Sequence, residues 1–236
     1  MLSALLFGVI ASSALVIGAV AGAYWRPPRF LLAAALAFAS GSLITALAYD
    51  LFEESFNSAG LWLSAAGLLA GAATFIAADT LLDRYMARAG SGVSAFALWA
   101  GVTLDGIPEN MALGVTLLET ASEAGAAVTL LVAIFASNLP EALGGAVGMR
   151  DQGRSKTFVI GVWAATAILL AAAVVLGNAA LAGVSEEPLA VLLAFAGGAV
   201  LASLADTLMP DAYREGGPLI AFATAAGFLL SFLIAR

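Results

Sequence analysis

The sequence predicts an all-α integral membrane protein with eight transmembrane helices. Of its 236 residues, 62% are hydrophobic and only 11% are charged, whereas soluble domains carry about 25% charged residues. Eight runs approach the length of about 20 mostly apolar residues that a bilayer-spanning helix needs. Basic residues cluster in alternate breaks between these runs, as expected of a chain that crosses a membrane repeatedly.

The eight apolar runs account for nearly the whole chain, at residues 2–24, 30–51, 61–82, 95–118, 125–149, 158–180, 189–209 and 218–235. The breaks are short, so residues 1–236 are expected to form a single transmembrane domain without a soluble part. The first run is expected to be a span rather than a cleavable signal peptide, because no basic residue precedes it and no small-residue cleavage site follows it.

Residue types that are missing exclude several functions. The chain has no Cys and no His, which excludes a disulfide framework, thiolate zinc sites and histidine acid/base chemistry. The net charge of −7 provides no basic face, so no nucleic-acid partner is expected. The composition points to the lipid bilayer as the main partner and not to an enzyme.

The loop charges predict the orientation of the chain. One set of alternate breaks holds eight of the nine basic residues, namely Arg26, Arg29, Arg84, Arg88, Arg150, Arg154, Lys156 and Arg214. In the opposite breaks every charged residue is acidic, namely Glu53, Glu54, Glu119, Glu123, Glu186 and Glu187. By the positive-inside rule, both termini are expected to be extracytoplasmic in a multi-pass protein of the plasma membrane, of the prokaryotic inner-membrane kind.

Two segments of the chain resemble each other. The segment that begins at Phe38 in the second run aligns with the one that begins at Phe195 in the seventh, and Gly41 matches Gly198. Because these two spans would cross in opposite directions, the similarity predicts an inverted-topology repeat of helices 1–3 and 6–8 around central helices 4 and 5. The alternative is a chance similarity between two stretches rich in Ala, Leu and Gly.

Carboxylates occur at the centre of two consecutive spans. Asp105 and Glu109 lie in the fourth span, and Glu141 lies in the fifth. An ionised carboxylate at a helix centre costs about 2.5–3.5 kcal/mol on insertion scales. No span contains a basic residue, so a bound cation is the simplest partner for these groups.

The spacing of polar residues predicts a metal site between the fourth and fifth spans. Asp105 and Glu109 share a helical face, as do Ser137 and Glu141, while Asn138 is three residues from Glu141. A proline precedes each glutamate and leaves a backbone carbonyl unpaired beside it. The candidate ligands are therefore Asp105, Glu109, Ser137, Asn138 and Glu141. The alternative is a pair of ordinary proline kinks, with protonated glutamates hydrogen-bonded between helices.

Further carboxylates occur near the span ends. Asp50 and Asp206 end the two repeated segments and are expected either to line the approaches to the site or to be solvated helix-end residues. Asp79 and Asp83 are expected to cap a helix or to pair with Arg84 near the inner surface.

These motifs resemble the ZIP family of divalent-metal transporters. The resemblance rests on Pro-Glu in the fourth and fifth of eight spans, on Phe195-Ala-Gly-Gly and on Met209-Pro-Asp. It implies that helices one, four, five and six form a moving unit and that the rest form a scaffold with a homodimer interface. The chain departs from the family pattern in having no histidine: Asp105 stands where the family has His, and Ser137 where it commonly has His or Gln.

The expected function is transport of a divalent metal cation such as zinc, manganese or iron(II), with the ion as cargo and no tightly bound cofactor. All donors are oxygens, which suit manganese and similar ions better than zinc, whereas the family resemblance favours zinc. Two alternatives stay open: a proton-coupled carrier of another small solute, and a non-transporting membrane scaffold or sensor.

Overall fold

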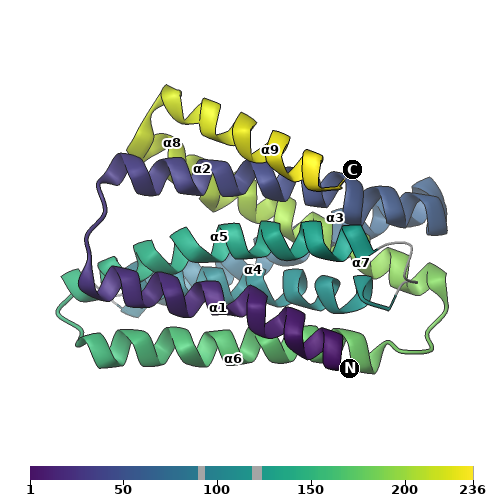
Figure 1. Cartoon of the computed structure of the whole chain (residues 1–236), viewed down its shortest axis with the longest axis horizontal. Coiled ribbons are helices and arrows are strands. Elements are labelled where there is room, and N and C mark those ends of the chain that lie inside the picture. Colours follow the sequence, from purple (N-terminus) through teal and green to yellow (C-terminus); the bar gives the residue numbers. More distant parts are fainter. Residues whose placement is uncertain (90–93, 119–123, 236) are drawn as a thin grey trace.

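The computed structural model of the chain describes residues 1–89, 94–118 and 124–235, and every regular element in them is a helix (Figure 1). Helices make up 92% of the structure, and these residues contain no strand. The predicted all-α class is confirmed. Helices suit this composition because each one satisfies its backbone hydrogen bonds internally, as a segment within a bilayer must.

The helices begin and end close to the apolar runs. They are α1 (Leu2–Tyr24), α2 (Arg29–Ala46), α3 (Glu54–Ala89), α4 (Ser94–Thr116), α5 (Ala124–Asp151), α6 (Lys156–Ala180), α7 (Glu186–Ser203), α8 (Met209–Gly216) and α9 (Ala221–Ala235). Two π-helical segments continue α2 and α7, at Leu47–Glu53 and Leu204–Leu208. A short 3₁₀ turn, Pro218–Ile220, leads into α9.

Five helical stretches within the described residues are long and apolar enough to cross a membrane, which makes the chain compatible with a multi-pass membrane protein. They are Leu2–Tyr24, Arg29–Tyr85, Gly125–Asp151, Lys156–Ala180 and Glu186–Gly216. Helix α4 is not among them, because Asp105, Glu109 and Asn110 lower its hydropathy. The last apolar helix, Pro218–Ile234, is shorter.

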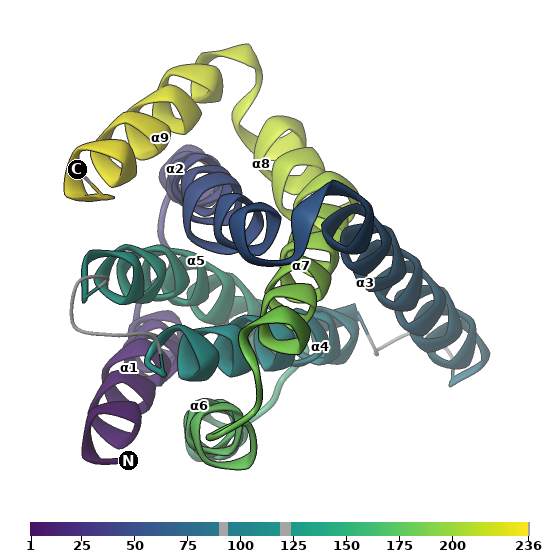
Figure 2. The ribbon, with the colours of Figure 1, turned by 90° about the vertical axis from the view of Figure 1, so that its right-hand side faces the viewer.

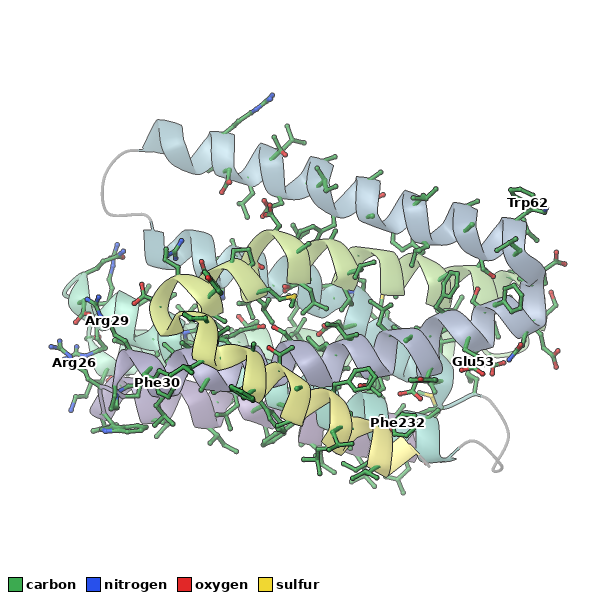
Figure 3. The ribbon with its side chains drawn as sticks, turned by 90° about the horizontal axis from the view of Figure 1, so that it is seen from above. Arg26, Arg29, Phe30, Glu53, Trp62 and Phe232 are labelled. Carbon is green, nitrogen blue, oxygen red and sulfur yellow. The ribbon has the colours of Figure 1, made fainter. Side chains whose placement is uncertain are left out.

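The stretch Arg29–Tyr85 covers two of the eight expected spans and reverses direction at Gly60. The backbone of Gly60 has φ 76° and ψ 171°, a conformation that glycine adopts without steric cost. Ser55 Oγ donates a hydrogen bond to Ser64 Oγ across this turn at 2.8 Å, and both serines are buried. Glu53 and Trp62 consequently lie at the same end of the bundle (Figure 3).

The two ends of the bundle differ in charge. Arg26 and Arg29 lie at one end, called the arginine-rich end, and Glu53 lies at the other, called the glutamate-rich end (Figure 3). Arg26 pairs with Asp151 at 2.6 Å at the arginine-rich end, through exposed side chains. Both termini lie toward the glutamate-rich end (Figure 1), as expected for an even number of crossings.

The helices form two groups that meet along α5, α4 and α7 (Figure 2). In the first group, α1 packs on α5 and α6, and α4 packs on α6. Trp99 Nε1 donates to Thr166 Oγ1 at 2.7 Å and Asn178 Nδ2 donates to the carbonyl of Gly114 at 3.1 Å, so α4 is tied to α6 at two levels. In the second group, α2 packs on α9 and α3 packs on α7.

The α2–α9 contact depends on two glycines. A Cβ atom at Gly41 would collide with the carbonyl oxygen of Thr224, and one at Gly227 would collide with that of Phe38. Small residues of this kind let two helix backbones approach closely within a membrane. Thr45 Oγ1 adds a hydrogen bond to the carbonyl of Phe228 at 3.1 Å.

The α3–α7 contact has the same design. A Cβ atom at Gly71 would collide with the carbonyl oxygen of Phe195, and one at Gly198 would collide with that of Leu68. Phe38 and Phe195 are matched residues in the two similar segments, and so are Gly41 and Gly198. Gly41 and Phe38 therefore have the same roles in the α2–α9 contact as Gly198 and Phe195 have in the α7–α3 contact.

We expect Gly198→Leu to destabilise the protein by about 3 kcal/mol, because backbone atoms of Leu68 occupy the space that the new side chain needs. Gly161→Leu is the matched control, since a Cβ there meets no atom within 4 Å. Thermal unfolding of the two purified variants in detergent measures the difference. Equal midpoints would contradict the close packing of α3 on α7.

Candidate functional site

The structure brings the three midspan carboxylates together between α4 and α5. Asp105, Glu109 and Glu141 are buried, with 8%, 6% and 7% of their surface exposed. Glu141 lies close enough to both Asp105 and Glu109 to interact with them electrostatically. Residues 32 to 36 positions apart in sequence thus lie near one another in the fold.

Each of the two helices carries a proline directly before its glutamate. Pro108 lies within α4 and Pro140 lies within α5, and both helices continue past them. A proline has no backbone N–H, so the carbonyls of Leu104 and Ala136 lose their usual helical partner. Two backbone oxygens are thereby freed one turn before Glu109 and Glu141.

Asp105 is held by a residue from the other helix group. Ser203 Oγ, at the end of α7, donates a short hydrogen bond to Asp105 Oδ2. Thr207 Oγ1 donates to the carbonyl of Ser203 at 2.8 Å. Ser203 is not among the residues predicted from the sequence, because no local pattern indicates that α7 ends beside α4.

The neutral candidate ligands are also buried, with 2% exposure for both Ser137 and Asn138. Ser137 Oγ donates to the carbonyl of Ile134 in its own helix at 3.1 Å. In the described part of the chain, Asn138 Nδ2 has no hydrogen-bond partner. Ser137 and Asn138 thus lie on α5 within one turn of Glu141.

Asn110 is a buried oxygen donor that the sequence analysis did not select. It is fully buried, and its Nδ2 donates to the carbonyl of Gly106 at 2.8 Å. Its Oδ1 has no partner among the described residues. An unpaired buried amide oxygen is costly, and its position next to Glu109 could have drawn attention to it.

A cavity of about 620 Å³ leads from the arginine-rich end to this site. Asp105, Pro140 and Glu141 line its deep part, and Arg29, Arg214 and Glu215 also line it. Between them lie four more carboxylates, those of Asp79, Asp83, Asp206 and Asp211. The cavity is therefore acidic, and it reaches two of the three site carboxylates, Asp105 and Glu141.

The two residues predicted to line the approaches lie in different surroundings. Asp206 is exposed and lines the cavity. Asp50 is buried in the π-helical segment Leu47–Glu53, and its Oδ2 has no partner within the described residues. The cavity reaches Asp206 but not Asp50.

Asp79 and Asp83 lie in the acidic cavity, and one of the two roles expected for them, pairing with Arg84, is not seen in the described part of the chain. Both line the cavity, and Asp79 interacts with Asp83 and Asp206. The expected pairing with Arg84 is absent from the salt bridges of the described residues. The sequence alone does not decide between pairing with Arg84 and lining the cavity, because tertiary packing determines which face of α3 turns toward α7.

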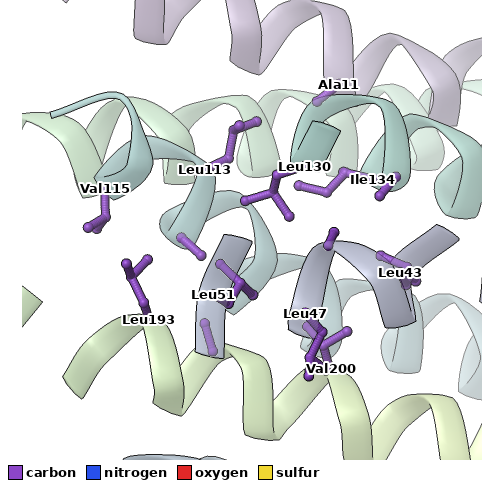
Figure 4. Packing of buried hydrophobic residues seen from close by; sticks show 14 of the residues in the cluster. Ala11, Leu43, Leu47, Leu51, Leu113, Val115, Leu130, Ile134, Leu193 and Val200 are labelled. Carbon is purple, nitrogen blue, oxygen red and sulfur yellow. The ribbon is translucent and has the colours of Figure 1, made fainter. Parts of the chain in front are cut away.

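Apolar side chains close the other side of the site. A cluster that we call the leucine seal contains Leu47, Leu51, Leu113, Leu130, Ile134 and Leu193 (Figure 4). It extends toward the glutamate-rich end, since Leu51 is two residues from Glu53 (Figure 3). These side chains come from α4, α5, α7 and the segment that follows α2. The site is thus open toward one end of the bundle and sealed toward the other.

The predicted cation cage is not pre-assembled. Among the described residues, no three Asp or Glu side chains are grouped so that they could hold a metal ion. Like-charged carboxylates repel each other, and Ser203 at the end of α7 holds Asp105 by a hydrogen bond.

Comparisons with known proteins assign no family: no family model matches the chain, and no curated protein is significantly similar to it. The resemblance to the ZIP family therefore rests on the sequence motifs alone.

We expect a cysteine at Thr207 to react with a charged, membrane-impermeant thiol reagent, because Thr207 lines the cavity. A cysteine at Ile134, in the leucine seal, should stay unreactive because that side chain is fully buried. The chain has no native cysteine, so each variant carries a single thiol. Equal labelling of both variants would contradict the one-sided opening.

Proposed function

We propose that the protein transports a divalent metal cation across the membrane and that Asp105, Glu109 and Glu141 bind the ion. One observation carries this proposal: three buried carboxylates lie near one another, and none of the eight apolar runs predicted to span the membrane contains a lysine or arginine. Uncompensated carboxylates at such depth are costly and are typical of ion pathways. A divalent cation neutralises two of the three charges at once.

The donor set favours a hard or borderline ion. Three carboxylates, the amides of Asn110 and Asn138 and the hydroxyl of Ser137 offer only oxygens, which suit manganese and magnesium, and less readily iron(II). Zinc accepts carboxylates but usually takes nitrogen or sulfur ligands as well. The resemblance to the ZIP family supports a transported ion such as zinc, manganese or iron.

The cavity supports transport rather than storage. Its lining includes seven carboxylates and two arginines, so it concentrates cations near the site. An acidic cavity on one side and the leucine seal on the other correspond to one of the two states of an alternating-access transporter. In this proposal the opposite state opens the leucine seal and closes the cavity.

The proposal includes eight spans and an inverted repeat. Two features support the repeat: the matched glycine contacts of α2 with α9 and of α7 with α3, and the π-helical segments that begin at the matched residues Leu47 and Leu204. Helices α1, α4, α5 and α6 would move as a unit against the remaining helices. A homodimer through that second group belongs to the same proposal.

Orientation follows from the same charges. We assign the arginine-rich end to the cytoplasm of a plasma membrane and the glutamate-rich end, with both termini, to the outside. The acidic cavity would then face the cytoplasm.

Replacing either buried glutamate by glutamine should lower metal uptake into liposomes by at least tenfold, because the amide keeps the size of the side chain but removes its charge. The variants are Glu109→Gln and Glu141→Gln. The double variant should add little to either single change, since residues that bind one ion act as a unit. Uptake of manganese, iron(II), zinc and magnesium is compared for each variant.

Glu186→Gln is the matched control, because Glu186 is exposed at the glutamate-rich end; it should transport normally. Near wild-type flux in both single variants would reject the carboxylate site. Metal-independent, pH-driven flux in the wild type would favour a proton-coupled carrier instead, and absence of any flux would favour a scaffold or sensor.

Single cysteines test the orientation. At Ser3 and Ser58 they should react with an impermeant maleimide added to intact cells, and at Thr157 only after permeabilisation. Residues 3 and 58 lie toward the glutamate-rich end, whereas Thr157 follows Lys156 at the opposite end. The reverse pattern would invert the orientation, and labelling of Ser3 and Ser58 from different sides would reject the antiparallel arrangement of α1 and α2.

A further inference from the structure

A second cavity, of about 300 Å³, lies between α3, α4 and α7, and none of the side chains proposed to bind the ion lines it. Its lining includes Phe75, Ala78, Ile107, Pro108, Met111 and Phe195. Cavities of this size are at the lower limit of those that bind small ligands. The apolar lining of this cavity restricts the kind of ligand that it can bind.

The side chains that line the cavity offer no free polar group to a ligand among the described residues. Thr74 is the one hydroxyl-bearing residue in the lining among the described residues, and its Oγ1 already donates to the carbonyl of Ala70 at 2.8 Å. Apolar cavities exclude water and take up apolar ligands. The chemistry of the lining therefore selects a hydrocarbon group.

The depth of the cavity identifies the source of that group. Phe75, Pro108 and Phe195 each lie near the middle of an expected span, far from both charged ends of the bundle. Beside the cavity, Thr74 and Ile76 are exposed on α3, with 56% exposure for Ile76. At this depth a membrane presents only lipid tails to such an opening.

One residue joins this cavity to the acidic one. Phe75, which is 4% exposed, lines both cavities. Its ring is thus a wall with an acidic aqueous space on one side and an apolar space on the other. Whatever fills the apolar cavity packs against the back of that wall.

We propose that this cavity binds one acyl chain of a membrane phospholipid and that the chain supports Phe75 as the barrier between the bilayer and the acidic cavity. The binding depends only on the apolar lining and its depth, and it stands whether or not the protein transports a metal. The role of Phe75 as a barrier concerns the cavity itself and is tested without any flux measurement.

Photocrosslinking tests the site directly. The purified protein is reconstituted in palmitoyl-oleoyl phosphatidylcholine vesicles that contain a small fraction of a phosphatidylcholine with a diazirine in its acyl chain. After irradiation, mass spectrometry maps the adducts. We expect them to concentrate on cavity residues such as Phe75, Ala78 and Met111.

Two neighbouring substitutions separate the cavity from the general lipid surface. Ala78→Phe fills the cavity from α3 and should reduce the cavity adducts at least fivefold. Ala77→Phe adds the same side chain one residue away, at an exposed position outside the lining, and should leave them unchanged. Ala199→Leu fills the cavity from α7 and serves if Ala78→Phe fails to fold.

Phe75→Ala removes the wall. It should extend the acyl-chain adducts to Val102, which lines the acidic cavity, and wild-type protein should show none there. Adducts spread evenly over the lipid-facing helices, or unchanged in both filling variants, would overturn the site. Labelling by a diazirine fatty acid but not by the phospholipid analogue would overturn the assignment to a phospholipid.

Discussion

Three carboxylates buried among apolar helices without a basic partner are the constraint on which the rest of this structure depends. Charge at such depth is tolerated where it faces other polar groups or an aqueous space rather than lipid. Asp105, Glu109 and Glu141 meet this condition, because α4 and α5 turn them toward each other and the acidic cavity reaches two of them. Pro108 and Pro140 each free a backbone carbonyl oxygen in the same region, and the buried amide of Asn110 adds a further oxygen.

The helices around this site are held at close range by glycine rather than by interlocking large side chains. Gly41 and Gly227 join α2 to α9, and Gly71 and Gly198 join α3 to α7. Such backbone contacts have little room for adjustment, since any added side chain meets a carbonyl oxygen. Helix α4 instead contacts α7 and α3 beside the apolar cavity, so part of the boundary between the two helix groups is not filled by protein atoms.

The sequence was sufficient for local features and insufficient for contacts between distant segments. Hydropathy located the helices, and the polar break before residue 61 contains the turn at Gly60. Spacing along α4 and α5 anticipated that Asp105, Glu109 and Glu141 would meet, because two helices with matching midspan polar residues bury them best against each other. Ser203 was not anticipated, because its approach to Asp105 depends on how α7 crosses α4. The same limit applies to Asp79 and Asp83, whose surroundings depend on the neighbours of α3.

The hydrogen bond from Ser203 to Asp105 crosses from one helix group to the other. If the groups slide against each other, as the proposed transport requires, this contact would have to break, because it is only a few ångströms long. A cation that takes the oxygen atoms of Asp105 competes with the serine for the same lone pairs. Under the proposed function, cation binding and this hydrogen bond would therefore depend on the same carboxylate: the bond would join the two groups when the site is empty and would be released when the site is filled.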